Sequence, residues 1–191
     1  MKSPVPTLAA LAALFFGPLI IAIVLYGGRD SLGGFGQVRN PDRELIAEPP
    51  TVPLEALRLA DGTTSDAAWA RSRWSLIYAR MRACEEECAA ALGRLHQVWL
   101  ALGGERDRMQ QVFLAPPSDA ETDVPADFLI GILEPTDSSA LIDLLGIERL
   151  EEGRYFVVDP LGNVILSYPV GADQNRLLKD LERLLDVSRV G

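Results

Sequence analysis

The only two cysteines of the chain, Cys84 and Cys88, have the type and spacing to do thiol chemistry. They follow the run Trp74–Ala79, whose apolar, aromatic and β-branched residues predict a short buried strand. From Ala89 onward apolar residues recur at helical spacing, so the pair is expected where a strand ends and a helix begins. At a helix N-terminus, unpaired N–H groups and the positive end of the helix dipole favour thiolate over thiol. The pair is therefore a candidate redox-active or metal-binding dithiol.

The spacing of the two cysteines limits what they can form. In a regular helix the Cβ atoms of residues i and i+4 lie roughly 5–6 Å apart, whereas a disulfide needs about 3.5–4.5 Å. A disulfide therefore requires Cys84 to lie in the looser first turn or just before it. The dithiol could otherwise hold a soft metal such as Cu(I). A structural disulfide, or two small buried residues at a helix start, is the plain alternative to a functional pair.

Charged residues lie on both sides of the first cysteine. Arg80 and Arg82 would favour the thiolate, and the run Glu85–Glu87 would disfavour it. Such glutamates are typical of a solvated first helical turn, which the helix dipole stabilises. A second acidic stretch, Ser118–Pro125, is expected to be a solvated loop.

The composition excludes several classes of function. The chain has 18 Lys and Arg against 27 Asp and Glu, with no basic patch, so nucleic acid is not expected as a partner. Its single histidine, His96, lies about 12 Å beyond Cys88 along the predicted helix. It cannot share a metal with the cysteines, and it cannot complete a zinc site of the Cys and His type. We expect His96 to be a partly buried structural residue.

The N-terminal residues predict a membrane anchor. The uncharged run Leu8–Tyr26 has the length of about 20 residues that crosses a bilayer. Lys2 precedes this run, which favours an N-terminus in the cytoplasm. The length of the run and the poor cleavage site at Leu25-Tyr26-Gly27 favour an uncleaved anchor over a signal peptide. Residues 1–26 are thus predicted to be a cytoplasmic tip and transmembrane helix, with the rest in a compartment that permits disulfides.

The remaining chain predicts a linker and one folded domain. Residues 27–53 are rich in glycine and proline and predict the linker. Residues 54–191 contain six runs that predict strands: Leu57–Leu59, Trp74–Ala79, Gln111–Ala115, Phe128–Leu133, Tyr155–Val158 and Val164–Tyr168. Helices are expected from Ala89 to Leu102, after a cap at Asp137, and after a cap at Asp173. This order predicts an α/β sheet with flanking helices, and a dithiol at its first strand-to-helix junction is the layout of a thioredoxin-like fold.

The motifs in this order resemble those of the Sco proteins, which are membrane-anchored thioredoxin-like factors of cytochrome c oxidase assembly. The resemblance runs from Arg73 through Cys84-x3-Cys88 to Val112-Phe113-Leu114. That family also has an N-terminal anchor and a late Asp-Pro-x-Gly hairpin, present here as Asp159-Pro160-Leu161-Gly162. The chain is more similar still to a Sco-related group of proteobacterial inner-membrane proteins. In that group the anchor, the proline-rich linker and the pattern Arg108–Leu114 recur together.

One departure from the Sco pattern concerns copper. The resemblance implies a third copper ligand, a histidine shortly before the strand that ends in Asp-Pro. The corresponding stretch here, Leu150–Tyr155, has no histidine, and it has no proline to serve as the cis-proline of ordinary thioredoxins. Only Cys84 and Cys88 transfer as site residues. Copper is thus a candidate cofactor held by these two thiolates, and no other cofactor is expected.

The resemblance implies three hypotheses for function. In the first, Cys84 and Cys88 form a thiol–disulfide reductant that keeps copper-site cysteines of an oxidase subunit reduced, with Cys84 attacking first by analogy with thioredoxins. In the second, the pair carries Cu(I) as a chaperone. In the third, the domain is a non-catalytic assembly scaffold. The expected partner is a cytochrome c oxidase subunit or another copper-assembly protein. The expected location is the inner membrane, spanned once, with the C-terminal domain in the periplasm.

Overall fold

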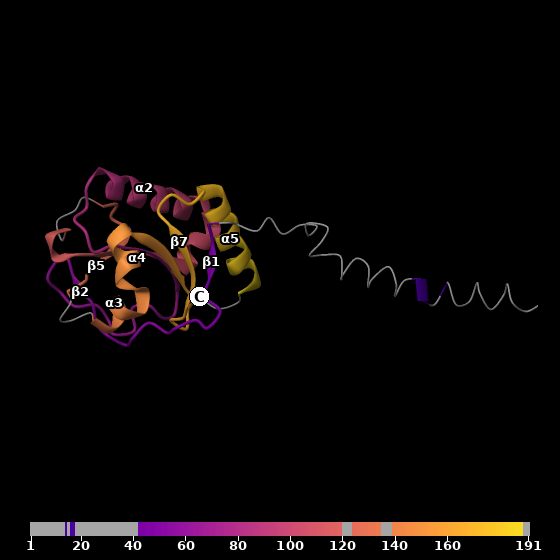
Figure 1. The fold of residues 1–191 in the computed structure, drawn as a ribbon, viewed down its shortest axis with the longest axis horizontal. Helices are drawn as coiled ribbons and strands as arrows, with labels where there is room; N and C mark the ends of the chain where they lie inside the picture. Colours follow the sequence, from indigo (N-terminus) through magenta and orange to yellow (C-terminus); the bar gives the residue numbers. More distant parts are fainter. Residues whose placement is uncertain (1–13, 15, 18–41, 120–123, 135–138, 189–191) are drawn as a thin grey trace, which may run out of the picture. The chain divides into compact units, whose positions relative to one another are not determined.

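The computed structural model describes residues 14, 16–17, 42–119, 124–134 and 139–188 (Figure 1). The chain divides into two compact units, Met1–Arg39 and Asn40–Gly191. Most of the predicted span Leu8–Tyr26 lies outside the described residues, so the anchor stays a prediction. Among the residues that are described, no helix has the length and hydropathy to cross a membrane. All elements named below belong to the second unit.

The second unit is built on one mixed sheet of seven strands in the order β1-β7-β6-β3-β4-β5-β2. Strands β3, β4 and β5 are parallel, and the remaining pairs are antiparallel. The strands span Glu44–Leu45 (β1), Arg58–Leu59 (β2), Trp74–Ala79 (β3), Met109–Ala115 (β4), Phe128–Ile132 (β5), Arg154–Val158 (β6) and Val164–Pro169 (β7). The predicted strands are thus all present, with small shifts at their ends.

Helices cover both faces of this sheet, as the sequence predicts (Figure 1). They span Glu86–Ala101 (α2), Ser139–Leu145 (α3), Ile147–Glu152 (α4) and Gln174–Val187 (α5), with short 3-10 helices at Gly103–Arg108 (η1) and Pro117–Asp119 (η2). Helices α2 and α5 pack on one face, and α3 and α4 contribute to the core on the other. The Asp173 side chain accepts a hydrogen bond from the Arg176 N–H at 3.0 Å, which confirms the predicted cap of α5. The predicted cap Asp137 lies outside the described residues.

Strand β3 lies at the centre of the sheet and is buried along its whole length. Its side chains alternate between the two faces, as the pleat of a strand requires. Leu76 and Tyr78 pack in the core beneath α2 and α5, whereas Ile77 and Ala79 pack in the core on the α3 and α4 side. A strand that is buried on both faces of a sheet has a continuous run of apolar residues in its sequence. This explains why Trp74–Ala79 is apolar throughout, and it gives the residues that follow β3 a rigid support.

Strand β1 comes from the segment 27–53 that the sequence predicts to be linker. Glu44 and Leu45 pair with Ser167 and Leu166 of β7. Two ion pairs add to this contact, because the Glu44 carboxylate lies 2.6 Å from Arg149 and 2.8 Å from Arg154. The folded unit therefore includes part of the predicted linker. A strand of two residues has no hydrophobic period, so the sequence gives no signal for it.

Candidate functional site

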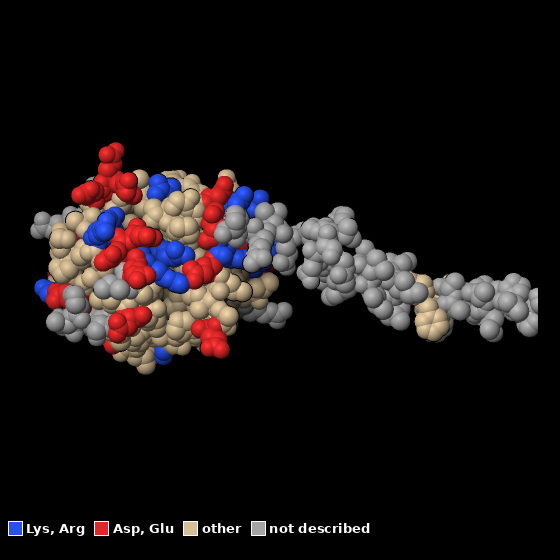
Figure 2. All heavy atoms as spheres, in the orientation of Figure 1, with Lys and Arg blue, Asp and Glu red and all other residues tan. Residues whose placement is uncertain are grey.

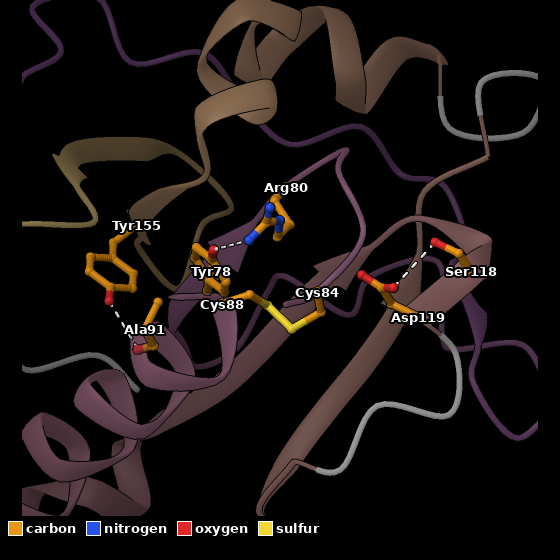
Figure 3. The surroundings of a disulfide bond; sticks show 8 residues. All are labelled: Tyr78, Arg80, Cys84, Cys88, Ala91, Ser118, Asp119 and Tyr155. Carbon is orange, nitrogen blue, oxygen red and sulfur yellow. Dashed lines mark hydrogen bonds between the residues drawn. A yellow bond between two sulfur atoms is a disulfide. The ribbon is translucent and has the colours of Figure 1, made fainter. Parts of the chain in front are cut away.

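The candidate site is a disulfide between Cys84 and Cys88, at the junction of β3 and α2 (Figure 3). Their Cα atoms lie 5.1 Å apart. Helix α2 begins at Glu86 with Glu85 as its N-cap, so Cys84 precedes the helix and Cys88 lies in its first turn. Because Cys88 follows Cys84 by four positions along the chain, the two cysteines can form a disulfide only if Cys84 lies in or before a loosened first turn. The structure confirms this, because Cys84 lies before the first turn of α2. The first turn of α2 contains Glu86 and Glu87, in agreement with the prediction that the glutamate run lies in a first helical turn.

The two cysteines differ in their exposure to solvent. Cys88 is fully buried, with an exposed fraction of 0%, and it belongs to the core beneath α2. Cys84 is only partly buried and packs against the edge of that core. A partner molecule can therefore reach the sulfur of Cys84 first, while the sulfur of Cys88 is protected.

The start of α2 is held against the sheet by buried contacts. Leu92, Leu95 and Val98 fill the core between the helix and the strands. The Tyr155 hydroxyl of β6 donates a hydrogen bond of 2.9 Å to the carbonyl of Ala91, one turn after Cys88 (Figure 3). The helix that carries Cys88 is thus fixed to the same sheet that positions Cys84.

Tyr78 and Tyr155 belong to the same buried core as Cys88. The Tyr78 ring stacks on Phe113 with ring centroids 5.6 Å apart, and it meets the Tyr155 ring at 5.5 Å. Burial raises the pKa of Tyr78, although Arg80 opposes this, and burial raises the pKa of Tyr155 to about 12. Both phenols therefore stay protonated at neutral pH. Arg80 points toward the Tyr78 hydroxyl, and its Nη1 lies 3.4 Å from that oxygen (Figure 3).

Gly153, in the stretch before β6, lies where a ligand side chain would not fit. Its φ of 78° lies in the left-handed region that side chains rarely adopt. A Cβ built on Gly153 would lie 2.8 Å from the Tyr78 hydroxyl oxygen. The space that a side chain at this position would need is therefore occupied by Tyr78.

Asp119 is a residue of the site that the sequence argument missed. The sequence predicts an acidic loop over Ser118–Pro125 that is solvated near Glu121 and Asp123, and these two residues lie outside the described residues. Asp119, at the start of this stretch, is buried, with an exposed fraction of 6%. It ends η2, directly after β4, and Figure 3 shows its carboxylate between Ser118 and Cys84. Because β3 and β4 are parallel neighbours, the residues that follow both strands meet at one edge of the sheet. This convergence depends on the order of the strands, so no local sequence pattern signals that Asp119 is buried.

His96 lies away from the disulfide, on the part of α2 that faces β4 and β5. Its Nδ1 is 3.2 Å from Oε1 of Gln111, and its ring stacks on Trp99 with ring centroids 5.8 Å apart. It is partly buried, as the sequence predicts for a structural histidine. In the part of the chain that the structure describes, no three His, Cys, Asp or Glu side chains gather as a metal site. Among the described residues, the potential copper ligands of the site are thus the two cysteine sulfur atoms, which are bonded to each other in the disulfide.

Comparison with known proteins identifies the family of this domain. Residues 74–188 match the model of the transmembrane-like, thioredoxin-like, C-terminal domain family. A comparison with curated proteins gave no match.

Solved structures with the same fold include Sco proteins and a thiol:disulfide interchange protein. BsSco, a Sco-family cytochrome c oxidase assembly protein with a disulfide switch, is 12% identical at a TM-score of 0.54, covering 76% of this chain and 100% of its own. Copper-bound yeast Sco1 is 12% identical at a TM-score of 0.61, covering 76% and 96%. The putative interchange protein DsbE of Chlorobium tepidum is 16% identical at a TM-score of 0.55, covering 73% and 99%. At these identities the comparisons show a shared thioredoxin-like fold, which confirms the predicted fold of the domain.

Proposed function

Because the chain belongs to the transmembrane-like, thioredoxin-like, C-terminal domain family, we propose that it is a membrane-anchored thiol–disulfide reductant in cytochrome c oxidase assembly. The observation that supports this best is the asymmetry of the disulfide, in which Cys84 is accessible and Cys88 is fully buried. Thiol–disulfide exchange needs one sulfur that a partner can reach and a second that resolves the mixed disulfide. The likeness to BsSco and DsbE supports the same chemistry.

The proposed reaction passes two electrons to a partner disulfide. The thiolate of reduced Cys84 attacks one partner sulfur, the bond between them forms as the partner S–S bond breaks, and the second partner sulfur leaves as a thiolate. The thiolate of Cys88 then attacks Cys84. This closes the intramolecular disulfide and releases the first partner sulfur, so that both partner sulfurs end as thiols. A separate dithiol donor returns the protein to its reduced state.

The proposal places this domain in the periplasm, tethered to the inner membrane by a single span. The uncharged run Leu8–Tyr26 supports the tether. The disulfide supports an extracytoplasmic domain, since disulfides persist in oxidising compartments. The substrate in this proposal is the disulfide form of the copper-site cysteines of an oxidase subunit, which must be dithiols to bind copper.

A trapping experiment tests the proposal. The full-length chain with Cys88→Ser, purified in mild detergent and reduced, is mixed with the oxidised copper-binding subunit. Cys84 should form a mixed disulfide that persists, because the resolving sulfur is absent. The matched variant Cys84→Ser should form none. An oxidised subunit that is never reduced by the unsubstituted chain, and never trapped by Cys88→Ser, would contradict the proposal.

Copper carriage is a second candidate function. Reduction of the disulfide would leave two soft thiolates side by side, and such ligands suit Cu(I). The copper-bound state of yeast Sco1 supports this alternative. A competition titration of the reduced full-length chain against a Cu(I) chelator tests it. Tight equimolar binding that Cys88→Ala abolishes would favour carriage, whereas weak binding would leave the reductant as the better account.

A further inference from the structure

We propose that Arg80 and Arg94 form a binding site for a carboxylate group beside the disulfide, and that the ligand is an acidic side chain of the partner protein. This inference rests on the proposed reductant function and adds a determinant of partner choice to that same site. Arg80 follows β3, in the segment that leads to Cys84, and Arg94 lies on α2, six residues after Cys88. The two side chains thus come from the strand and the helix that hold the disulfide.

Both guanidinium groups lie at the same pair of tyrosine rings. Nη1 of Arg80 is 3.4 Å from the Tyr78 hydroxyl, among the residues drawn around the disulfide in Figure 3. The Arg94 guanidinium lies against the Tyr155 hydroxyl, which donates a hydrogen bond to Ala91 on the same helix. Burial raises the pKa of Tyr78, and the charges of Arg80 and Arg94 both oppose this increase. Since the two rings lie 5.5 Å apart, both positive charges gather around one tyrosine pair.

Neither guanidinium has an acidic partner within the part of the chain that the structure describes. Ion pairs of 4.0 Å or less hold other arginines of the fold to Asp or Glu, namely Arg43, Arg58, Arg108, Arg149, Arg154 and Arg176. The Nε atoms of Arg80 and Arg94 are instead buried, and no described residue accepts a hydrogen bond from them. The chain has 27 Asp and Glu against 18 Lys and Arg, so a lack of acidic residues is not the reason. A partly buried charge without a counterion costs free energy, which a bound carboxylate would offset.

The acidic residues near the site do not fill it. Glu87, in the first turn of α2, acts electrostatically on Tyr78, but its side chain is exposed to solvent. It precedes Arg94 by seven residues, so their Cα atoms lie about 10.5 Å apart along the helix. Asp119 accepts its hydrogen bond from Ser118. The described residues thus leave the two guanidinium groups to a carboxylate from another molecule.

The position of the site indicates where this carboxylate belongs in a partner. Guanidinium groups bind carboxylates through two parallel hydrogen bonds. Arg94 lies about 9 Å along α2 from Cys88, and an extended chain advances about 3.3 Å per residue. The acidic residue is therefore expected about three residues from the partner cysteine that Cys84 attacks. This separation favours a polypeptide, because a small thiol that carries a carboxylate does not span it.

The test compares peptide disulfides that differ in one charge. The reduced full-length chain in mild detergent reacts with symmetric disulfides of short peptides that carry Asp, Asn or Lys about three residues from the cysteine, on both sides. Each rate is divided by the rate of free β-mercaptoethanol with the same disulfide, which removes the intrinsic reactivity of the peptide. The Asp peptide should react at least roughly tenfold faster than the Lys peptide, the low end for a hydrogen bond to a charged group. The Asn peptide should lie between them.

Substitutions of the two arginines assign this preference to its source. Arg80→Gln and Arg94→Gln should each reduce the preference, and the double variant should abolish it. Arg73→Gln is the matched control, because Arg73 is exposed just before the opposite end of β3, and it should leave the preference unchanged. The unsubstituted chain supplies a test that does not depend on the folding of any variant. Raising the ionic strength from about 0.02 M to about 0.5 M should reduce its preference, since salt screens charges.

The outcomes distinguish this inference from the proposed function. Equal normalised rates for the three peptides, or a preference for Asp that persists in the double variant, would overturn the inference and leave the reductant function standing. A small anionic disulfide, dithiodipropionate, and its cationic counterpart, cystamine, complete the test. If dithiodipropionate is preferred over cystamine while the Asp and Lys peptides react equally, the ligand is a small carboxylate, and its assignment to a partner protein is wrong. If the unsubstituted chain reacts with none of these disulfides, the proposed reductant function fails instead.

Discussion

At the scale of residues, the site is defined by the unequal environments of two sulfur atoms. Cys84 precedes α2 and is partly exposed, whereas Cys88 lies in the first helical turn and is fully buried. The same spacing in a continuous helix would hold the Cβ atoms too far apart for a disulfide. The break between strand and helix thus allows the bond to form, and it also decides which sulfur a partner meets.

This inequality predicts the order of alkylation in the reduced protein. Cys84, studied in the Cys88→Ser variant, should react with iodoacetamide at least roughly tenfold faster than Cys88 in the Cys84→Ser variant. Cys88 reacts only after the first turn of α2 opens, and each ~1.4 kcal/mol of opening free energy slows the reaction tenfold. Mass spectrometry of timed samples measures both rates. Equal rates would show that Cys88 is not protected in solution.

Gly153 makes a second prediction at this scale. Gly153→Ala should lower the free energy of unfolding by about 1–3 kcal/mol, because alanine is strained at a φ of 78° and its Cβ would meet the Tyr78 hydroxyl. Denaturant unfolding of the full-length chain in detergent gives the value.

Gly104→Ala is the matched control for that change. Gly104 has no positive φ, and a Cβ there would meet no atom within 4 Å. The control should therefore be nearly neutral. A Gly153→Ala variant as stable as Gly104→Ala would contradict the packing described around Tyr78.

At the scale of elements, helices and strands with a clear hydrophobic period can be predicted from the sequence. Elements that form only because residues distant in the sequence bind them cannot. Strand β3 and helix α2 have clear periodicity, so both they and the cysteine junction could be predicted. Strand β1 has two residues and exists because β7, Arg149 and Arg154 bind it. Asp119 is buried because two parallel strands end side by side, and the order of strands in a sheet cannot be derived from chain-local spacing.

The attachment of β1 predicts a pH dependence. Burial alone would raise the pKa of Glu44, but the Ser167 hydrogen bond and the charges of Arg149 and Arg154 outweigh it, so its pKa lies below the ordinary 4.5. A carboxyl group of lowered pKa stabilises the fold fully above its ordinary value, and the effect is lost as pH falls through the lowered value. Glu44→Gln should therefore destabilise the protein by less than about 1 kcal/mol at neutral pH, since the pair is partly solvated.

The measurement for Glu44 is denaturant unfolding at neutral and at strongly acid pH. The difference between the unsubstituted chain and Glu44→Gln should vanish in acid, where both side chains are uncharged. Glu48→Gln, at an exposed position in the same segment, should show no difference at either pH. A Glu44→Gln effect of equal size at both pH values would rule out the ion pairs as its cause.

At the scale of the whole molecule, the distribution of charge on the surface indicates which class of macromolecule the protein could bind. The net charge is −9, and acidic and basic side chains are interspersed over the face drawn in Figure 2. Such a surface suits a protein partner better than a polyanion. The proposed exchange chemistry on a protein substrate would take place at the disulfide at the start of the first long helix.

The reduction potential of the Cys84–Cys88 disulfide tests the central claim most directly. The full-length chain in detergent is equilibrated with dithiol and disulfide buffers of known potential, and the reduced fraction is measured by alkylation and mass. A reductant that cycles must have a potential above about −300 mV, because structural disulfides lie below that value. A midpoint clearly above it, with complete and reversible cycling, is the result we predict. If the disulfide remains oxidised even in buffers more reducing than about −300 mV, it is a structural bond, and this result would contradict the account.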